Sequence, residues 1–279
     1  MGFLSPNSSS APDGGRMPRS RNRLRTRSRP PRLKQEHITM GQLDRKIAVI
    51  TGGGSGIGRA IAEAFAEEGA TCILAARGVE RLEAAASEIP NAVAIPTDVL
   101  EDDQVEALFD RVAADFGPVD ILVNNAGMAK PCPTHELPPD DFRQVIGVNV
   151  TGCFLCARKA LQQMIPRKSG RILNIGSISG QMSRPHSVAY TTSKFALDGM
   201  TRSLALDARE HGIAVSALHP GNVPTNIWGE LIEQVAEAEG MVPLEDIGQA
   251  ALSMVTMAPG TNVLSSIILP LSQPYLGRG

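Results

Sequence analysis

Residues 46–68 read KIAVITGGGSGIGRAIAEAFAEE, in which an apolar run, a glycine-rich turn and a helical pattern follow one another directly. Glycines let the backbone turn tightly and approach a ligand, and the amides at the start of a helix attract a phosphate. The glycines stand at Gly52, Gly56 and Gly58, and no Gly-Lys-Ser/Thr follows as in a nucleoside triphosphatase loop. The stretch therefore predicts a strand, a phosphate-binding turn and a helix.

Beyond this stretch, short runs of Ile, Val, Leu and Ala alternate with longer helical patterns, as at residues 58–68, 79–89 and 102–116. Such alternation is typical of βαβ units, which build a parallel sheet with helices on both faces. The expected strands are residues 46–51, 71–76, 92–96, 120–124, 170–177, 213–219 and 263–269. The predicted fold class is α/β, a single Rossmann-type, doubly wound parallel sheet of seven strands flanked by helices.

The first 41 residues differ from the remainder because they are rich in Ser, Pro, Gly and Arg and offer almost nothing to bury. We predict a disordered basic extension over residues 1–41 and one Rossmann-fold domain over residues 42–279. Three interpretations of the extension stay open: a tether to nucleic acid or a membrane surface, an organelle-targeting peptide, or a dispensable segment upstream of a start at Met40. Its prolines argue against an amphipathic targeting helix, and we favour the dispensable segment.

The net charge of -2 is unevenly distributed along the chain. Residues 1–42 hold nine of the 27 Lys and Arg but two of the 29 Asp and Glu, so the predicted domain is acidic. We expect no nucleic-acid partner. We also expect no membrane insertion, because no apolar run reaches the roughly 18 to 20 residues of a spanning helix. The start lacks the order of a secretory signal, so we expect a soluble, cytoplasmic protein.

The chain has four cysteines, Cys72, Cys132, Cys153 and Cys156. Cys153 and Cys156 form a C-x-x-C pair, but no second pair of Cys or His accompanies it at zinc-ligand spacing. Free thiols commonly pack as small apolar groups. We interpret the pair as packing rather than redox chemistry, and expect no metal site.

Tyr190 and Lys194 lie four positions apart in a helical stretch, so both side chains share one helix face. Alone, such a pair usually lies on a helix surface, but a neighbouring ammonium can stabilise a phenolate and let a tyrosine act as acid or base. Ser177 closes an expected strand, where its hydroxyl would meet a ligand at the carboxyl end of the sheet. Asn149 is polar in an apolar helical stretch and needs partners if buried. A kinked helix that holds a water molecule is one arrangement that would give a buried Asn149 such partners.

Arg77 follows the second expected strand, where an acidic residue would hold the ribose 2′-hydroxyl of NAD. A guanidinium can instead form charge-assisted bonds with a 2′-phosphate, so the position favours NADP, with NAD as the alternative cofactor. A solvated surface arginine is the other interpretation of this residue.

Taken together, these residues resemble the single-domain branch of the short-chain dehydrogenase/reductase family, from about Leu43 to the C-terminus. The family's T-G-x-x-x-G-x-G is present at residues 51–58 and its N-N-A-G at residues 124–127. Its catalytic serine, tyrosine and lysine correspond to Ser177, Tyr190 and Lys194. One mild departure is Gly176, where many members have a serine.

The resemblance implies an NADP-dependent oxidoreductase that transfers a hydride between nicotinamide and a carbonyl or secondary alcohol, with Tyr190 as acid or base. Ser177 and Tyr190 would bind this small-molecule substrate, Asn149 would complete a proton relay with Lys194, and Asp98 would contact the adenine. The implied cofactor-binding residues are Gly52, Ser55, Gly56, Ile57, Gly58, Arg77, Asp98, Val99, Asn125, Ala126, Gly127, Tyr190, Lys194, Pro220, Gly221, Val223 and Thr225. The family commonly pairs the helices that carry Asn149 and Tyr190, which implies a homo-dimer or homotetramer.

Residues 226–241 are the expected specificity segment, with Trp228, Leu231 and Ile232 as an amphipathic lid. Further candidates for the substrate pocket lie between the serine and the tyrosine, namely Gln181, Met182 and His186. The C-terminal ILPLSQPYLGRG resembles the tails of NADP-dependent family members that act on 3-hydroxy acids and small carbonyl compounds.

A rival hypothesis from another functional class is a catalytically weak, dinucleotide-sensing interaction module with a basic arm. The complete set of Asn149, Ser177, Tyr190 and Lys194 argues against lost catalysis.

Overall fold

The computed structural model describes residues 41–275, apart from the side chains of Trp228, Glu230 and Leu231. Within that span seven strands form one parallel sheet, in the order β3-β2-β1-β4-β5-β6-β7. The strands are β1 (Ile47–Thr51), β2 (Thr71–Ala76), β3 (Ala92–Pro96), β4 (Ile121–Asn124), β5 (Gly170–Ile175), β6 (Ile213–Pro220) and β7 (Ser265–Ile268). The predicted α/β class is confirmed, and each expected strand agrees with the observed one to within two residues at either end.

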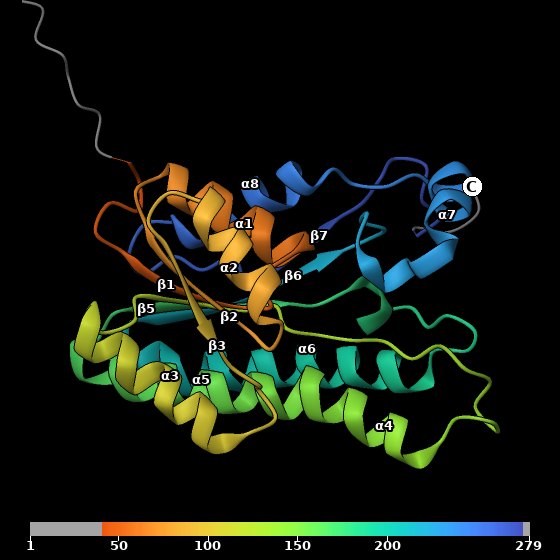
Figure 1. The fold of residues 1–279 in the computed structure, drawn as a ribbon, viewed down its shortest axis with the longest axis horizontal. Coiled ribbons are helices and arrows are strands. Elements are labelled where there is room, and N and C mark those ends of the chain that lie inside the picture. Colours follow the sequence, from red (N-terminus) through yellow and green to blue (C-terminus); the bar gives the residue numbers. More distant parts are fainter. Residues whose placement is uncertain (1–40, 276–279) are drawn as a thin grey trace, which may run out of the picture. The chain divides into compact units, whose positions relative to one another are not determined.

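Helices cover both faces of the sheet, with α1, α2 and α8 on one face and α3, α5 and α6 on the other (Figure 1). The α-helices are α1 (Gly56–Glu67), α2 (Val79–Glu88), α3 (Asp102–Asp115), α4 (Pro139–Ile146), α5 (Cys153–Met164), α6 (Val188–Ala208), α7 (Ile232–Glu239) and α8 (Leu244–Val255). A π-helical segment, η1 (Gly147–Gly152), joins α4 to α5. Short 3-10 segments include η3 (Ile178–Gly180) and η5 (Asn226–Leu231).

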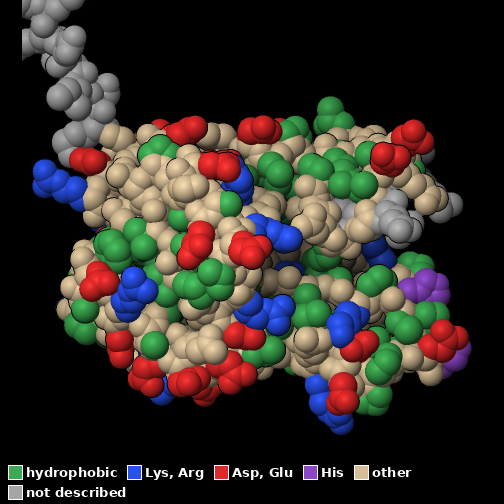
Figure 2. All heavy atoms as spheres, viewed as in Figure 1, with side chains coloured by type: hydrophobic (Ala, Val, Ile, Leu, Met, Phe, Trp, Pro, Cys, Tyr) green, Lys and Arg blue, Asp and Glu red, His purple; other side chains and the backbone are tan. Residues whose placement is uncertain are grey.

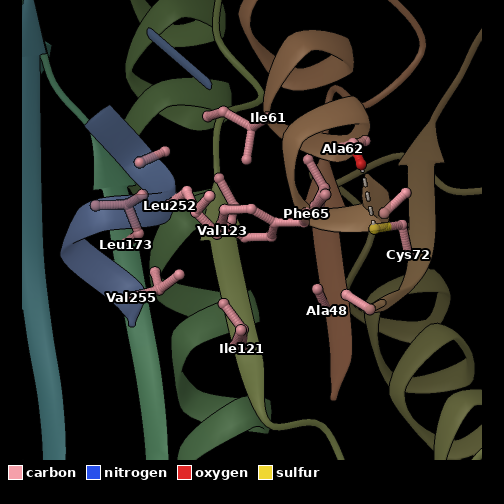
Figure 3. Packing of buried hydrophobic residues seen from close by; sticks show 14 of the residues in the cluster. Ala48, Ile61, Ala62, Phe65, Cys72, Ile121, Val123, Leu173, Leu252 and Val255 are labelled. Carbon is pink, nitrogen blue, oxygen red and sulfur yellow. Dashed lines mark hydrogen bonds between the residues drawn. The ribbon is translucent and has the colours of Figure 1, made fainter. Parts of the chain in front are cut away.

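The apolar core consists of two clusters, one on each side of the sheet. Every residue of β1 is buried, as expected for a parallel strand that helices cover on both faces. Figure 3 shows one cluster, in which Phe65 of α1 and Leu252 of α8 meet Val123 of β4 and Leu173 of β5. This two-sided burial explains why the strands are continuous apolar runs in the sequence.

The strand order reverses between β1 and β4, which are neighbours in the sheet. The chain leaves β1 through the glycine turn and leaves β4 through residues 125–127, so both turns lie at the carboxyl edge of the sheet. Open α/β sheets bind ligands in the crevice at such a point. The fold therefore places the predicted phosphate-binding turn where a nucleotide site is expected.

Acidic side chains gather over α3 on the face drawn in Figure 2. Among residues 41–275, the helices are all too short or too polar to cross a membrane. The predicted extension over residues 1–41 lies outside the described residues except for its last residue, so the division of the chain at this point stays a prediction.

Candidate active site

The glycine turn after β1 needs its glycines for conformation and for close packing. Gly52 has a φ of 66°, in the left-handed region that favours glycine. A Cβ at Gly58 would lie 2.4 Å from the carbonyl oxygen of Gly52 and 2.4 Å from the Asn125 Nδ2. A side chain at this position would therefore push the first turn of α1 away from the β4 turn.

Thr51 joins the glycine turn to the turn after β4. Its Oγ1 accepts hydrogen bonds from the backbone amides of Asn125 and Ala126, both at 3.0 Å, and donates to the Val123 carbonyl at 3.3 Å. The Asn125 Nδ2 donates to the Thr51 carbonyl oxygen at 2.9 Å. Sequence reasoning assigned no role to Thr51, although its place at the head of the glycine motif was a usable signal.

A cavity opens between these two turns and the start of the segment after β6. Ten of the seventeen predicted cofactor-binding residues line it: Gly52, Ser55, Gly56, Ile57, Asn125, Ala126, Gly127, Tyr190, Lys194 and Thr225. Three others, Pro220, Gly221 and Val223, line the adjoining cavity that also contains Ser177. Gly58, Arg77, Asp98 and Val99 line neither of the two.

The last three of these four residues lie near the end of the sheet formed by β2 and β3. The guanidinium of Arg77 is 3.8 Å from an Asp98 carboxylate oxygen, and its side chain is 59% exposed. Val99 is buried against Gly152 of η1, where an added Cβ would lie 2.7 Å from the Val99 Cγ2. A hollow beside the glycine turn is lined by Gly54 and Ala76 and also by Arg81, which sequence reasoning missed. Arg81 lies four positions after Arg77, on the first turn of α2, and this spacing could have identified it from the sequence.

Lys194 is buried, although lysine is rarely buried without a partner for its charge. Its Nζ donates to the Ile175 carbonyl at 2.8 Å and lies 5.5 Å from the centre of the Tyr190 ring. Within residues 41–275, no carboxylate pairs with this ammonium, which has three N–H donors and lines the cavity. A cation held in this way suits the polar oxygens of a dinucleotide, so the cavity fits the predicted cofactor.

Asn149 lies buried in the π-helical segment η1, so this polar side chain needs partners, as the sequence indicated. Its Oδ1 accepts from the Met128 amide at 2.8 Å, and its Nδ2 donates to the Met128 carbonyl and to the Ser193 Oγ, both at 2.9 Å. These bonds within the described chain go to Met128 and Ser193 rather than to Lys194. The predicted proton relay between Asn149 and Lys194 stays a prediction.

Ser177 follows β5 and is buried, and its Oγ accepts a hydrogen bond from the Ser179 amide at 3.1 Å. Behind it lies His219 of β6, whose Nδ1 is 3.3 Å from the Ser177 carbonyl oxygen. Burial lowers the pKa of His219, so its ring is neutral near pH 7. A Cβ at Gly176 would lie 2.4 Å from the same Nδ1, which explains why this chain has glycine where many family members have serine.

Because of this contact, Gly176→Ser should destabilise the protein by about 1–3 kcal/mol, the usual cost of overpacking a buried site. The free energy of unfolding in denaturant measures the loss. His219→Ala supplies the control, since the penalty of Gly176→Ser should shrink when the imidazole is gone. An equal penalty in both backgrounds would show that His219 is not the cause.

The second cavity, of about 250 Å³, is lined by Ser177 and Tyr190. Five residues belong to both cavities: Ile57, Gly176, Tyr190, Thr225 and Ile227. Tyr190 therefore lies at the boundary between the predicted cofactor site and the predicted substrate site.

The structure places the pocket candidates between Ser177 and Tyr190 on the surface, which for His186 was the alternative to a pocket wall. Gln181, Met182 and His186 are exposed and line neither cavity; Arg184, Pro185 and Ser187 of the same segment line the second one. The predicted lid stays a prediction, because Ile232 lines neither cavity and the side chains of Trp228 and Leu231 lie outside the description. Within the expected specificity segment, Ile227 of η5 lines both cavities. Sequence reasoning missed both Arg184 and Ile227.

The C-x-x-C pair is packed in the core, as predicted. Cys153 and Cys156 are buried in α5, and burial raises the pKa of the Cys153 thiol to about 11. Thiols of this kind are protonated at neutral pH and poor nucleophiles. In the described part of the chain, no three or more His, Cys, Asp or Glu side chains gather in a group that could hold a metal.

Comparison with known proteins gives a consistent result. The profile of the family described as short chain dehydrogenase matches residues 46–236. A 3beta-hydroxysteroid dehydrogenase of Mediterraneibacter gnavus is 36% identical over 225 residues, which cover 77% of this chain and 81% of that protein. A cis-4-hydroxycyclohexanecarboxylate dehydrogenase of Sinomonas cyclohexanicum is 38% identical over 210 residues, which cover 74% of this chain and 84% of that protein.

Solved structures agree with this result. A metagenomic short-chain oxidoreductase in complex with NADP is similar with a TM-score of 0.73 and 31% identity, covering 82% of this chain and 98% of that chain. A 3-ketoacyl-(acyl-carrier-protein) reductase from Brucella melitensis, complexed with NADH, has a TM-score of 0.76 and 29% identity, covering 81% and 98%.

Proposed function

Since the chain belongs to the short-chain dehydrogenase/reductase family and is an NAD(P)-dependent enzyme, we propose that it transfers a hydride between NADP and a carbonyl or secondary-alcohol substrate, with Tyr190 as acid or base. The observation that carries this proposal is the position of Tyr190 in the wall of both cavities. A group that exchanges a proton with the substrate must touch it at the place where it meets the cofactor.

The residues of the chain have separate tasks in this proposal. When bound, the nicotinamide supplies the hydride in reduction and accepts it in oxidation. In reduction, Ser177 and Tyr190 donate hydrogen bonds to the carbonyl oxygen, and Tyr190 gives up its proton as the alkoxide forms. The ammonium of Lys194, 5.5 Å from the phenol ring centre, favours the phenolate that remains. Oxidation follows the same path in reverse.

Asn149 is proposed to support this arrangement from behind the cavity. Its bonds to the backbone of Met128 hold the chain next to Gly127, and its bond to Ser193 holds α6 next to Lys194. A methyl group at Gly127 would lie 3.5 Å from the Asn149 Oδ1 and 3.9 Å from the Lys194 Nζ. Both side chains thus flank the same small space, which supports the predicted relay between them.

NADP is the proposed cofactor, because two arginines stand near the end of β2 and the position after β2 lacks an acidic residue. Arg77 follows β2 directly, and Arg81 lines the hollow beside the glycine turn together with Glu80. Both guanidinium groups could pair with a 2′-phosphate. The similar structures include one with NADP and one with NADH, so cofactor preference has to be measured on this chain.

Replacing Arg77 with Asp should weaken NADPH binding by on the order of 10- to 100-fold, because a charge-assisted bond is lost and a repulsive charge is added. NADH binding should change far less, since it carries no 2′-phosphate. Calorimetric Kd values for both cofactors test this, and Arg111→Asp on the exposed surface of α3 is the charge-matched control. Equal losses for the two cofactors would refute a role in 2′-phosphate binding.

An alcohol substrate also agrees with the names of the relatives, since a 3beta-hydroxysteroid and a cis-4-hydroxycyclohexanecarboxylate both carry a hydroxyl group. A panel of cyclic and linear ketones, with NADPH or NADH consumption followed by absorbance, tests the activity. Turnover of a ketone supports the proposed enzyme. Cofactor binding with no turnover of any panel member would favour the rival dinucleotide-sensing module.

We further propose a homo-oligomer, either a dimer or a tetramer, in the cytoplasm. Three large apolar side chains on α5 and α6 are exposed, namely Phe154, Phe195 and Leu206. Such residues often mark contact surfaces, and these helices are the ones expected to pair. The basic extension stays outside the proposed catalytic domain of residues 42–279.

A further inference from the structure

Arg184 is the only charged residue among the described residues that line the cavity of Ser177 and Tyr190. The remaining walls come mostly from apolar side chains and backbone, including Pro131, Ile178 and Ile227. The cavity measures about 250 Å³ and adjoins the cavity of the predicted cofactor site. Arg184 thus brings a guanidinium group to a wall of this cavity, next to side chains without charge.

The guanidinium of Arg184 is held in place by polar groups from other parts of the chain. Its Nη2 donates to the Asn222 Oδ1 at 2.9 Å and lies 3.5 Å from the Glu239 Oε2. Glu239 is the last residue of α7 and does not line the cavity. The carboxylate therefore steadies the arginine without occupying the cavity.

Glu239 does not depend on Arg184 for its own hydrogen bonds. Its Oε2 also accepts from the Asn222 Nδ2 at 2.9 Å and from the Gln273 Nε2 at 3.3 Å. The carboxylate would keep the hydrogen bonds from these two side-chain amides if the arginine were removed. Asn222 therefore contacts both the guanidinium and the carboxylate, and it lines the cavity beside Arg184.

We propose that Arg184 binds a carboxylate group of the substrate, so that the natural substrate is a hydroxy or oxo carboxylic acid. A guanidinium has five donors in a planar fork that matches the two oxygens of a carboxylate. Arg184 is about one-third exposed, at 33%, so such a bond would be stronger than one in open water. The inference rests on the proposed function, since the reacting oxygen is placed at Ser177 and Tyr190.

The carboxylate takes no part in the bond changes. In reduction, the ketone carbon gains a hydride from NADPH, its oxygen gains the proton of Tyr190, and solvent returns a proton to the phenolate. The products are the hydroxy acid and NADP. Arg184 thus selects and orients the substrate, while Tyr190 and Ser177 act on the oxygen at the other end.

A matched pair of ketones tests this assignment, 4-oxocyclohexanecarboxylate and its neutral analogue 4-oxocyclohexanecarboxamide. The wild-type enzyme should prefer the carboxylate. In Arg184→Met, kcat/KM for the carboxylate should fall by on the order of 10- to 100-fold, the range for a lost hydrogen bond to a charged group. The value for the carboxamide should change little, and Arg184→Lys should recover part of the loss.

Binding without turnover provides an independent measurement. Cyclohexanecarboxylate and cyclohexanecarboxamide have no reacting oxygen, so their Kd values for the NADP-loaded protein can be measured by calorimetry. Arg184→Met should weaken the carboxylate by a similar factor and leave the carboxamide nearly unchanged. Glu239→Gln is the control, because it removes the neighbouring negative charge and should keep or increase the preference for the carboxylate.

The outcomes separate this inference from the proposed function. The inference is wrong if wild type shows no preference for the carboxylate, or if Arg184→Met and Glu239→Gln weaken both compounds equally. Tyr190-dependent reduction of the carboxamide would then still support the proposed function. Conversely, Arg184-dependent binding of cyclohexanecarboxylate without reduction of any ketone would support the carboxylate site and refute the proposed activity.

Discussion

Tyr190→Phe should lower kcat/KM for ketone reduction by on the order of 10²- to 10⁴-fold, the usual contribution of a positioned general acid. The substitution removes one oxygen atom and keeps the ring that forms part of both cavities. The affinity for NADP and the free energy of unfolding should therefore stay nearly unchanged. Steady-state kinetics, calorimetry with NADP and denaturant unfolding measure the three quantities.

The chain supplies a matched control for this change, because its other tyrosine is Tyr275. The Tyr275 hydroxyl is hydrogen-bonded to Gln181, and neither residue lines the cavities. Tyr275→Phe removes the same atom from a site without a proposed role and should keep full activity. Undiminished turnover by Tyr190→Phe would show that another group exchanges the proton with the substrate.

Lys194→Met should lower kcat by about 10²- to 10³-fold, comparable to the loss of a key electrostatic group in an active site. The variant removes the buried ammonium near the Tyr190 ring and keeps a side chain of similar length. It should also raise the Kd for NADP, because the ammonium lines the cavity without a carboxylate partner among the described residues. Tyr190→Phe should leave this Kd nearly unaffected, which distinguishes the two roles.

Lys159→Met controls for the loss of a lysine charge, since Lys159 pairs with Glu106 of α3 and lines neither cavity. Its NADP affinity and turnover should match those of wild type. If Lys194→Met bound NADP normally and kept its turnover, the proposed support of the phenolate would be wrong. Unfolding curves establish that the variants compared are folded.

The fold could be predicted because its signals are local in the sequence. Apolar runs such as residues 71–76 are short, bounded by turns and fully covered by helices, so strand length and position follow from composition. The glycine turn could be recognised for a similar reason. Its Gly52 needs a positive φ and its Gly58 a close contact, and both demands are met by one residue type.

The walls of the substrate cavity could not be predicted in the same way. Residues 181–187 form a loop, where neither period 3.6 nor period 2 says which side chains face inward. His186 has a φ of 57°, which a non-glycine residue rarely adopts, and the loop exposes it while Arg184 lines the cavity. Two partners of Arg184, Asn222 and Glu239, lie 38 and 55 positions further along the chain, beyond any local pattern.

Asn149 lies between these two cases. A polar residue in an apolar helix indicates that hydrogen-bond partners are needed, but it does not indicate which residues they are. Its partners Met128 and Ser193 are 21 and 44 positions away, and they come together only when α6 packs beside η1. A kinked helix was one arrangement that the sequence allowed, whereas the π-helical turn and its hydrogen bonds depend on tertiary structure.

The most direct test of the central claim is to follow the transferred atom. NADPH carrying deuterium at the transferred position of C4 is incubated with the protein and a reducible ketone such as 4-oxocyclohexanecarboxylate, and the alcohol formed is analysed by mass spectrometry. Our account predicts one deuterium on the carbinol carbon, formed by wild type and greatly reduced in Tyr190→Phe. Oxidation of NADPH without deuterium on that carbon would contradict it.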